Sequence, residues 1–372
     1  VIYIVVLNCE EVLMYKKFDE LFIDETKYGT KIKTDKYLSE GKYPIVDQGQ
    51  KKISGYTDIE EGIFKEVPAI IFGDHTRLIK YIDVPFFIGA DGVKIIRSRL
   101  KKVNYKYLYY ALLNVHIPNT GYNRHFKWLK ETKIFYPDSE KQKHIVEVLD
   151  KISLIIEKKN RQIEQCDFLL KSLFIEMFGD PISNSKKWTI KRLVELSILI
   201  TNGTTPSGGS ENYIDSGVVF LRSQNVWKNR IDLEDTVYIS SSLHKIMSKS
   251  RVIYNDILIT KTGRINTENS SLGRAAIYKE KNKEANINGH VYLIRLKDTV
   301  NPEYILSILT GEAYREYIRR VCVGGIDKRQ INLNHVEDFP IIVPPLDLQN
   351  RFAEYVSSID KSKFASFSYL SA

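Results

Sequence analysis

The sequence is poor in the residues that build metal sites and disulfide frameworks. It holds three cysteines and seven histidines in 372 residues. Cys9, Cys166 and Cys322 lie far apart in the chain, which excludes the close spacings of zinc sites and of paired disulfides and fits a reducing cytoplasm. No two histidines are three or four residues apart, so the sequence predicts no metal site.

The sequence also lacks a long apolar run. The opening run, Val1–Leu7, is much shorter than the roughly 20 residues of a membrane span. No basic region precedes it and no small-residue cleavage site follows it, so it is a poor secretion signal. Methionine first occurs at Met14. We therefore expect residues 1–13 to lie upstream of the natural start, and we leave them out of the predicted fold.

Motifs for catalysis are weak or absent. No glycine-rich phosphate loop ending in Lys-Ser or Lys-Thr occurs. The run Asn301-Pro302-Glu303-Tyr304 differs from the Asn-Pro-Pro-Tyr motif of adenine methyltransferases at Glu303, and it is typical of a helix start. The Glu-x-Lys tripeptides at residues 25–27 and 131–133 lack an identifiable paired acidic residue for metal-dependent cleavage. We predict a chain that is non-catalytic by itself.

Charge is distributed unevenly along the chain. The net charge is +9, of which residues 1–137 carry +5 and residues 181–343 carry +6. The segment between them, residues 138–180, carries −2, and residues 344–372 are neutral. Two basic blocks favour a polyanionic partner.

The chain repeats itself with an offset of 207 residues. Ile134-Phe135-Tyr136-Pro137 is followed by Gln142, and Ile341-Ile342-Val343-Pro344 is followed by Gln349. Each copy is typical of a short apolar strand, a proline stop and an amphipathic helix. A period this long indicates a duplicated domain rather than a solenoid.

A long helix is predicted between the two copies, from about Ser139 to Phe178. Apolar residues follow the alternating three- and four-residue spacing of a coiled-coil seam, with Lys159 and Cys166 also on it. Gly179-Asp180-Pro181 then ends the helix. The predicted coiled-coil residues of this seam and of its continuation in the second copy are Leu149, Ile152, Ile156, Ile163, Leu170, Leu173, Met177, Val356 and Ile359.

Both flanking blocks indicate a mixed α/β (α+β) fold. The first has apolar strands at residues 68–72 and 92–96 and a helix after Asn104. The second has strands at 256–259 and 290–294 and a helix after Asn301. We predict two tandem domains and two helices, with these boundaries: domain 1 at 14–137, central helix at 138–180, domain 2 at 181–343 and distal helix at 344–372.

Three polar loops occur in corresponding places in each block. They are rich in Arg, Lys, Asn and Gln, which can pair bidentately with base edges, and in Gly, which allows close approach to phosphates. Solvated turns are the alternative for any single loop, but the threefold correspondence favours DNA. The candidate DNA-binding residues are Gln48, Gln50, Lys51, His75, Thr76, Arg77, Asn123, Arg124, His125, Arg222, Gln224, Asn225, Lys261, Thr262, Arg264, Lys328, Arg329 and Gln330.

Clustered aromatic residues are assigned to the core rather than to base stacking. Tyr105, Tyr107, Tyr109, Tyr110 and Trp128 have helical spacing, which is more typical of a packed helix face.

Taken in order, these features resemble the specificity subunit of type I restriction–modification enzymes, over residues 14–363. The resemblance is carried by the tandem blocks, the twice-used proline–glutamine–helix unit, the central helix ending in Phe178-Gly179-Asp180-Pro181, and Gly73-Asp74-His75-Thr76-Arg77. It implies that each block reads one half of a bipartite, asymmetric double-stranded DNA site.

The resemblance also implies partners. The helices would pack antiparallel and dock two methylation subunits, and restriction subunits would join through the complex. S-adenosylmethionine, ATP and Mg²⁺ would belong to those subunits, with no cofactor in this chain and no membrane contact. The expected location is the cytoplasm of a bacterium or archaeon.

Two other functions remain open from the residues. One is an autonomous nuclease or fused methyltransferase, which needs an acidic pair with lysine in one block. The other is a coiled-coil interaction protein whose basic domains bind protein or RNA. Sequence-selective protection of a bipartite DNA duplex, with no such protection of RNA, would distinguish a DNA-specificity protein from this interaction protein.

The distal helix differs from the first copy. The offset carries the seam onto Val356, Ile359, Lys363, Ser366 and Leu370, so apolar periodicity fails after Ile359. We expect residues 364–372 to form a short unrelated tail after a truncated helix.

Overall fold

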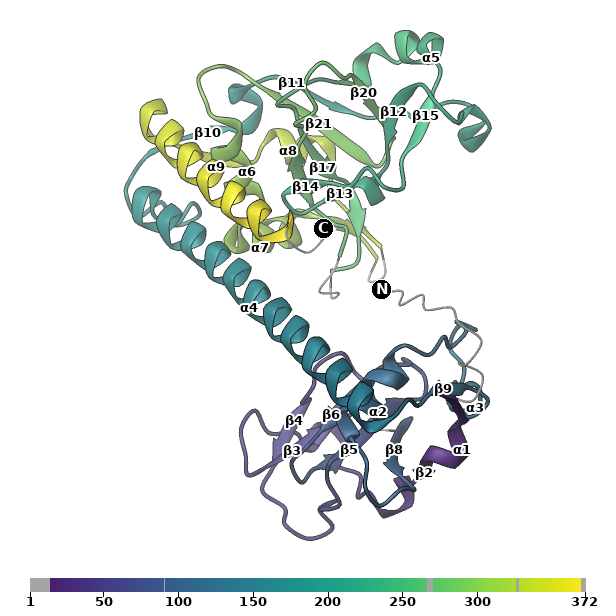
Figure 1. The fold of residues 1–372 in the computed structure, drawn as a ribbon. Coiled ribbons are helices and arrows are strands. Elements are labelled where there is room, and N and C mark those ends of the chain that lie inside the picture. Colours follow the sequence, from purple (N-terminus) through teal and green to yellow (C-terminus); the bar gives the residue numbers. More distant parts are fainter. Residues whose placement is uncertain (1–13, 90, 266–269, 326–327, 369–372) are drawn as a thin grey trace. The chain divides into compact units, whose positions relative to one another are not determined.

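The structure is a computed structural model that describes residues 14–89, 91–265, 270–325 and 328–368. Residues 1–13, which we expected to lie upstream of the natural start, fall outside the described residues. The chain divides into two compact units, Val1–Lys158 (unit 1) and Lys159–Ala372 (unit 2) (Figure 1). The finer division into four segments stays a prediction.

Unit 1 contains two sheets and a terminal strand pair. The main sheet has the antiparallel order β2-β8-β5-β6, and the second sheet has the order β4-β3-β7, in which β3 and β7 are parallel. The strands are β1 (Tyr15–Lys17), β2 (Phe22–Asp24), β3 (Tyr43–Val46), β4 (Gly55–Thr57), β5 (Ala69–Gly73), β6 (Ile79–Ile82), β7 (Phe87–Ile88), β8 (Val93–Ser98) and β9 (Lys133–Phe135).

Strand β5 is apolar throughout because both of its faces are covered. Ile70 and Phe72 face the helix side, where Leu108 and Leu112 pack. The alternate residues face the second sheet. The helices are α1 (Phe18–Leu21), α2 (Tyr105–Leu113) and α3 (Phe126–Lys130), with short 3-10 helices η2 (Thr26–Tyr28) and η3 (Thr34–Lys36).

Unit 2 repeats this arrangement and adds to it. Its main sheet has the antiparallel order β11-β21-β17-β19, and its second sheet has the order β15-β12-β20-β16, in which β12 and β20 are parallel. The strands of these two sheets are β11 (Ser197–Asn202), β12 (Val218–Leu221), β15 (Val237–Ile239), β16 (Arg251–Val252), β17 (Ile257–Thr260), β19 (Ala275–Ile277), β20 (Ala285–Ile287) and β21 (Val291–Leu296).

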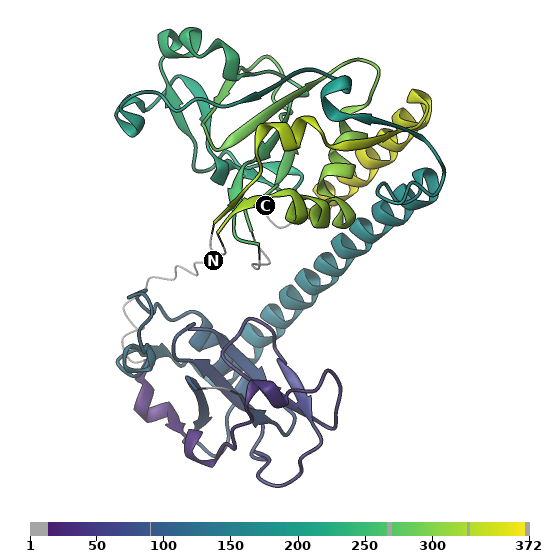
Figure 2. The ribbon, with the colours of Figure 1, turned by 180° about the vertical axis from the view of Figure 1, so that it is seen from behind.

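Three smaller strand groups complete unit 2, and Figure 2 shows the ribbon of this unit from behind. They are β10 (Thr189–Arg192) with β24 (Pro340–Val343), β13 (Val226–Trp227) with β14 (Arg230–Ile231), and β18 (Thr262–Gly263) with β22 (Val323–Gly324) and β23 (Arg329–Gln330). The helices are α5 (Ser241–Ile246), α6 (Pro302–Thr310), α7 (Glu312–Val321), α8 (Leu333–Glu337), η4 (Leu193–Leu196), η5 (Gly209–Asn212), η6 (Ser223–Asn225) and η7 (Ser248–Ser250).

The predicted mixed α/β character of both blocks is confirmed. In each unit the two predicted central strands pair directly and antiparallel, β5 with β8 and β17 with β21. The predicted caps are also confirmed. The Asn104 side chain accepts from the N–H of Tyr107 at 3.1 Å, and the Asn301 side chain accepts from the N–H of Glu303 at 2.9 Å. Asn301-Pro302-Glu303 is therefore a helix start, as its sequence predicted.

The central helix, α4, runs from Ser139 to Phe178, as predicted. It ends where Gly179 adopts the left-handed conformation, with φ of +77°, and its N–H bonds the carbonyl of Ile175 at 2.8 Å. A side chain at this position would be strained because L-residues rarely adopt positive φ.

The distal helix, α9, covers Leu346–Ser368, so our expectation of an unrelated tail from residue 364 is wrong as far as residue 368. Residues 369–372 lie outside the described part of the chain. The segment contains neither glycine nor proline, so its backbone continues as a helix even where the apolar seam fails.

Candidate nucleic-acid interface

The three predicted loops of unit 1 come together in the structure. They are residues 47–52 after β3, residues 73–77 at the end of β5, and residues 119–125 before α3; we call them the unit 1 loop cluster. The backbone N–H of His75 donates to Oε1 of Gln48 at 3.2 Å, and Oγ1 of Thr76 donates to the carbonyl of Gln48 at 2.7 Å. Nδ1 of His75 lies 3.2 Å from the carbonyl oxygen of Asn123. The three loops therefore form one surface.

Two buried residues join the second and third loops. The Asp74 carboxylate accepts from the N–H of Phe126 at 2.7 Å, and the Asp74 carbonyl lies 3.0 Å from Nδ1 of His125. His125 is completely buried. Its prediction as a DNA-contacting residue is therefore wrong for this conformation: a buried polar ring is held by hydrogen bonds inside the protein, and here it fixes the loop.

Two other predicted residues of the cluster, Arg77 and Gln48, make hydrogen bonds within the protein. Arg77 has φ of +61° and donates from Nη1 to the carbonyl of Ile117 at 3.3 Å. Both ends of the Gln48 amide make hydrogen bonds: its Oε1 accepts from the N–H of His75 in the cluster, and its Nε2 donates to the carbonyl of Asp91, just before β8, at 2.9 Å. The predicted residues left exposed to solvent are Gln50, Lys51, Thr76, Asn123 and Arg124.

Lys80, which was not among the predicted residues, holds the backbone of the first loop from the interior of unit 1. Its side chain is 7% exposed, and its Nζ donates to the carbonyls of Asp47 at 2.7 Å and Lys51 at 2.6 Å. Burial lowers the pKa of Lys80 against the opposing effect of the Asp47 carboxylate. The signal was available in β6, Ile-Lys-Tyr-Ile, where alternation turns Lys80 to the same face as the buried Ile82.

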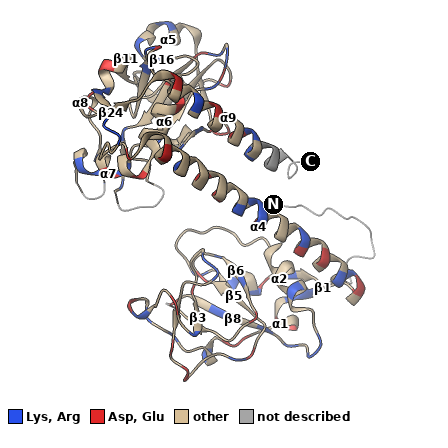
Figure 3. Cartoon of the chain, turned by 90° about the vertical axis from the view of Figure 1, so that its left-hand side faces the viewer, with Lys and Arg blue, Asp and Glu red and all other residues tan. Residues whose placement is uncertain are grey.

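In unit 2, the second and third predicted loops also meet. Strand β18 pairs with β23, so that Thr262 lies opposite Gln330 and Gly263 opposite Arg329. Nζ of Lys261 lies 5.5 Å from the ring centroid of Tyr292 beneath them. Arg264 and Lys328 are exposed, whereas the other predicted residues of these two loops are half-buried. Lys and Arg lie on the loops of both units (blue in Figure 3).

The first predicted loop of unit 2 is largely engaged by one acidic residue, Asp235. Arg222 pairs with the Asp235 carboxylate at 3.2 Å and donates to its carbonyl at 2.7 Å, and Gln224 bonds the same carboxylate. Asn225 is buried, with 1% exposure, and its Nδ2 donates to the carbonyls of Asp232 and Asp235. Its prediction as a DNA contact is therefore wrong for this conformation.

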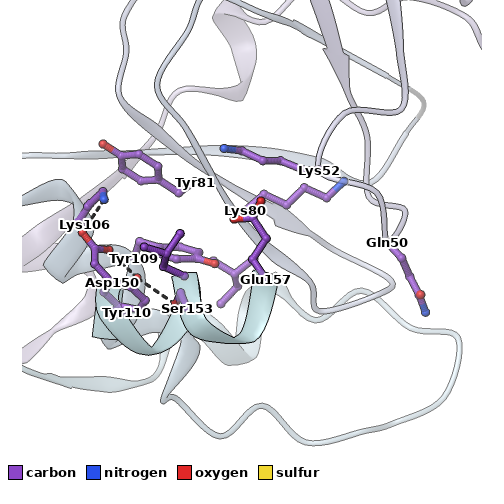
Figure 4. A pocket seen from close by; sticks show the side chains of 12 residues that line it. Gln50, Lys52, Lys80, Tyr81, Lys106, Tyr109, Tyr110, Asp150, Ser153 and Glu157 are labelled. Carbon is purple, nitrogen blue, oxygen red and sulfur yellow. Dashed lines mark hydrogen bonds and ion pairs between the residues drawn. The ribbon is translucent and has the colours of Figure 1, made fainter. Parts of the chain in front are cut away.

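A pocket of about 610 Å³ opens beside the first loop of unit 1 (Figure 4). Lys106 pairs with Asp150 at 2.6 Å, and the Tyr110 hydroxyl donates to the same carboxylate at 2.7 Å. Burial raises the pKa of Asp150, but these two hydrogen bonds outweigh it and hold the pKa below its ordinary value. The carboxylate therefore joins α2 to the first part of α4.

Within unit 2, α4 and α9 pack antiparallel. The Phe352 ring lies 5.5 Å from those of both Phe174 and Phe178, and Lys363 pairs with Asp167 at 2.5 Å. Of the predicted seam, Val356 is buried, and Leu170, Leu173 and Met177 are partly buried against the same core. Phe174 and Phe178, which were not among the predicted seam residues, make the ring contacts to Phe352 of α9.

Parts of α4 stay uncovered. Ile156, a predicted seam residue, is exposed, whereas Leu149, Ile152, Ile163 and Ile359 are half-buried. Further exposed apolar side chains lie off the seam: Val148, Leu154 and Ile155 in unit 1, and Phe168, Leu169 and Ile175 in unit 2.

The described residues contain neither a cluster of metal-ligating side chains nor a helix suited to crossing a membrane. Among them, no group of three or more His, Cys, Asp or Glu side chains is placed to hold a metal ion. Within the same ranges, no helix combines the length and apolar character that a membrane span requires.

Comparison with known proteins identifies the family. The family described as "Type I restriction modification DNA specificity domain" matches residues 13–165 and 185–366. The EcoR124I/EcoR124II type I restriction enzyme specificity subunit of Escherichia coli is 22% identical over 351 residues, which cover 90% of this chain and 83% of that protein.

Two other relatives agree. The MjaX type I restriction enzyme specificity subunit of Methanocaldococcus jannaschii is 25% identical over 174 residues, 46% of this chain, and the match spans 39% of that protein's length. The crystal structure of a type I restriction–modification S subunit from M. genitalium shares the fold, with a TM-score of 0.57 and 17% identity over 96% of this chain and 91% of that one. This chain therefore belongs to the type I restriction modification DNA specificity domain family.

Proposed function

We propose that this chain is the DNA-specificity subunit of a type I restriction–modification enzyme, in which unit 1 reads one half of a bipartite duplex and unit 2 reads the other. The observation that carries the proposal is the repetition of one layered fold, with a polar loop surface in each copy and different side chains on the two surfaces. Different loops on equal scaffolds would give an asymmetric target.

The cations left exposed on these surfaces support duplex DNA as the ligand. Lys51 and Arg124 are exposed in unit 1, and Arg264 and Lys328 are exposed in unit 2. Lys and Arg neutralise phosphates, and Arg can also bond guanine edges bidentately. The autonomous nuclease and the RNA- or protein-binding alternatives have no comparable support in the described residues.

The exposed apolar residues of α4 support docking of methylation subunits. Each unit carries such residues on its own portion of the helix, which is consistent with two docked subunits. We propose that S-adenosylmethionine, ATP and Mg²⁺ are bound by the partner subunits and that this chain supplies specificity alone. Replacing Phe168, which is 72% exposed, by Asp should weaken docking. Ile246→Asp, at an equally exposed position on α5, is the matched control.

The function is tested by selecting duplexes from a randomised library with the purified chain and methylation subunit, and by mapping methylated adenines on genomic DNA. Two short sequence blocks separated by unread base pairs are expected. Enrichment of a single continuous block, or equal retention of RNA, would overturn the proposal.

A further inference from the structure

Tyr122 stands out from the other large apolar and aromatic side chains of the described residues. Its side chain is 87% exposed, at the tip of the third loop of the unit 1 loop cluster. The aromatic residues that the sequence assigned to the core behave differently, because Tyr107 is buried and Trp128 is half-buried. Packing in the fold therefore does not account for Tyr122.

The ring is exposed but held in place. It stacks on the His75 ring with centroids 4.7 Å apart and planes only 8° from parallel. His75 is itself fixed, because its N–H bonds Gln48 and its Nδ1 lies 3.2 Å from the Asn123 carbonyl. One face of Tyr122 is thus supported by a second ring, and the opposite face is open.

The loop backbone adds to this order. Gly121 has φ of +77°, and its carbonyl accepts from the N–H of Asn123 at 2.9 Å, which closes a turn around Tyr122. Buried His125 holds the start of the loop, because its Nε2 lies 3.3 Å from the Thr120 hydroxyl oxygen. Because the loop and the ring are already ordered in the free protein, binding does not have to overcome the conformational entropy of fixing them. The ring is therefore preorganised to stack on a planar ligand.

The chemistry around the ring specifies the ligand. Arg124 is exposed two residues away, and Gln50 and Lys51 are exposed on the first loop of the same cluster. Cations beside an aromatic face are the combination with which proteins bind nucleic acid, the cations contacting phosphates and the ring stacking on bases. Within a regular duplex both faces of each base are covered by neighbouring bases. A base that stacks on Tyr122 must therefore be unstacked from one neighbour.

We propose that Tyr122 is a base-stacking residue of the first half-site, that it holds one base partly out of the duplex stack, and that His75 is its supporting positioning residue. This rests on the proposed function. Specificity then includes the ease with which one base step opens, in addition to contacts with base edges.

The test uses the full chain with a methylation subunit and the duplex selected from the randomised library. 2-Aminopurine replaces each base of the target in turn, and its fluorescence rises where stacking is lost. We expect one position in the half-site read by unit 1 to brighten with the wild-type chain and with Tyr122→Phe. Tyr122→Ala should abolish that signal and weaken binding about tenfold, in the range seen for loss of one base stack.

Three comparisons make the result specific. His75→Phe, which keeps a ring beneath Tyr122, should retain more of the signal than His75→Ala. Tyr122→Ala should leave the salt dependence of binding unchanged, whereas Lys51→Ala should reduce it. Tyr28→Ala is the matched control, since Tyr28 is 61% exposed on η2, outside the three loops. Thermal melting of each variant checks that the fold is intact.

The possible failures are distinguishable. If the wild-type chain selects no bipartite duplex, the proposed function fails and the inference falls with it. If it selects one, but Tyr122→Ala binds and fluoresces as the wild type does, the stacking role is overturned while the proposed function stands. A weaker affinity without any 2-aminopurine signal in the wild type would place Tyr122 on the sugar–phosphate backbone and would also overturn the proposal.

Discussion

Gln142 and Gln349, which are 207 residues apart, make the same hydrogen bond in the two halves of the chain. Each donates from Nε2 to the carbonyl of the proline five residues earlier, Pro137 or Pro344, at 2.8 Å. Both side chains are buried. Each proline follows the end of a strand, so its carbonyl lies outside the backbone hydrogen bonds of the strand pair. The glutamine at the start of the next helix supplies the missing hydrogen bond. The repeated sequence unit is thus a repeated strand-to-helix joint.

The two joints should differ in strength. Gln349 also accepts from the N–H of Asn301 through Oε1, at 2.9 Å. Gln349→Ala leaves a buried carbonyl and a part-buried N–H unpaired and should destabilise unit 2 by about 2–4 kcal/mol, whereas Gln142→Ala should destabilise unit 1 by about 1–2 kcal/mol. Urea unfolding followed by tryptophan fluorescence measures both, since Trp128 lies in unit 1 and Trp188 and Trp227 lie in unit 2. Equal losses would show that the Asn301 bond contributes nothing.

Features that depend on local sequence were predicted well. The bounds of α4 follow from its apolar spacing and its glycine stop, and the caps at Asn104 and Asn301 follow from side chains next to the residues they bond. The duplicated strand and helix at each Pro–Gln unit follow from the repeat. Each of these signals lies within a few residues of the structure it determines, so one sequence suffices to find it.

The misassigned loop residues depend on contacts between distant segments. His125 is polar and lies in a glycine-bearing loop, but Asp74, 51 residues earlier, buries it. Asn225 is buried with bonds to Asp232 and Asp235, which follow the paired strands β13 and β14, and the sequence pattern does not show that the chain returns to Asn225 there. Tyr122 was missed for the opposite reason: its exposure and its stack on His75 exist only because two loops meet.

Binding of the target duplex should weaken steeply with salt. The basic surplus of both blocks and the exposed Lys51, Arg124, Arg264 and Lys328 place cations where phosphates would lie. Each neutralised phosphate contributes roughly −0.9 to the slope of log K against log salt. Fluorescence anisotropy between low and physiological salt measures the slope. A slope near zero contradicts the electrostatic account.

Arg124 and Arg264 should affect different half-sites. Each is exposed on the loop surface of its own unit, so loss of a base-reading Arg should cost about 1–3 kcal/mol and relax preference in one half only. Library selection with Arg124→Ala and with Arg264→Ala compares the two. If Arg264→Ala altered preference in the half that Arg124→Ala also alters, the assignment of one unit to each half would be wrong. Arg77→Ala should instead disturb the fold of the loops, since Arg77 bonds the Ile117 carbonyl.

Asp24 should make the stability of unit 1 depend on acid pH. Burial raises the pKa of Asp24, but hydrogen bonds from Thr26 and the charge of Lys94, 3.3 Å away, outweigh it and hold the pKa below its ordinary value of 3.8. Because the folded pKa lies below the unfolded one, the stabilisation is complete above about pH 4 and is lost as pH falls through the folded pKa. Urea unfolding should separate Asp24→Asn from the wild type at pH 7, and the difference should shrink steadily as the pH falls below about 4. In a Lys94→Met background the pH-dependent difference should shrink; an unchanged difference would exclude Lys94 as a cause.

Phe352 should be the residue that holds α9 on α4. It is 1% exposed, and its ring meets those of Phe174 and Phe178 edge-on at 5.5 Å. Phe352→Ala removes these contacts and opens a cavity in the core of unit 2, at a cost of about 3–5 kcal/mol. Tyr355→Ala, on the same helix but 44% exposed, should cost less than about 1 kcal/mol. Hydrogen exchange of the α9 amides, read with urea unfolding, distinguishes release of the helix from loss of the whole unit. Equal losses for the two variants would show that the aromatic cluster does not anchor α9.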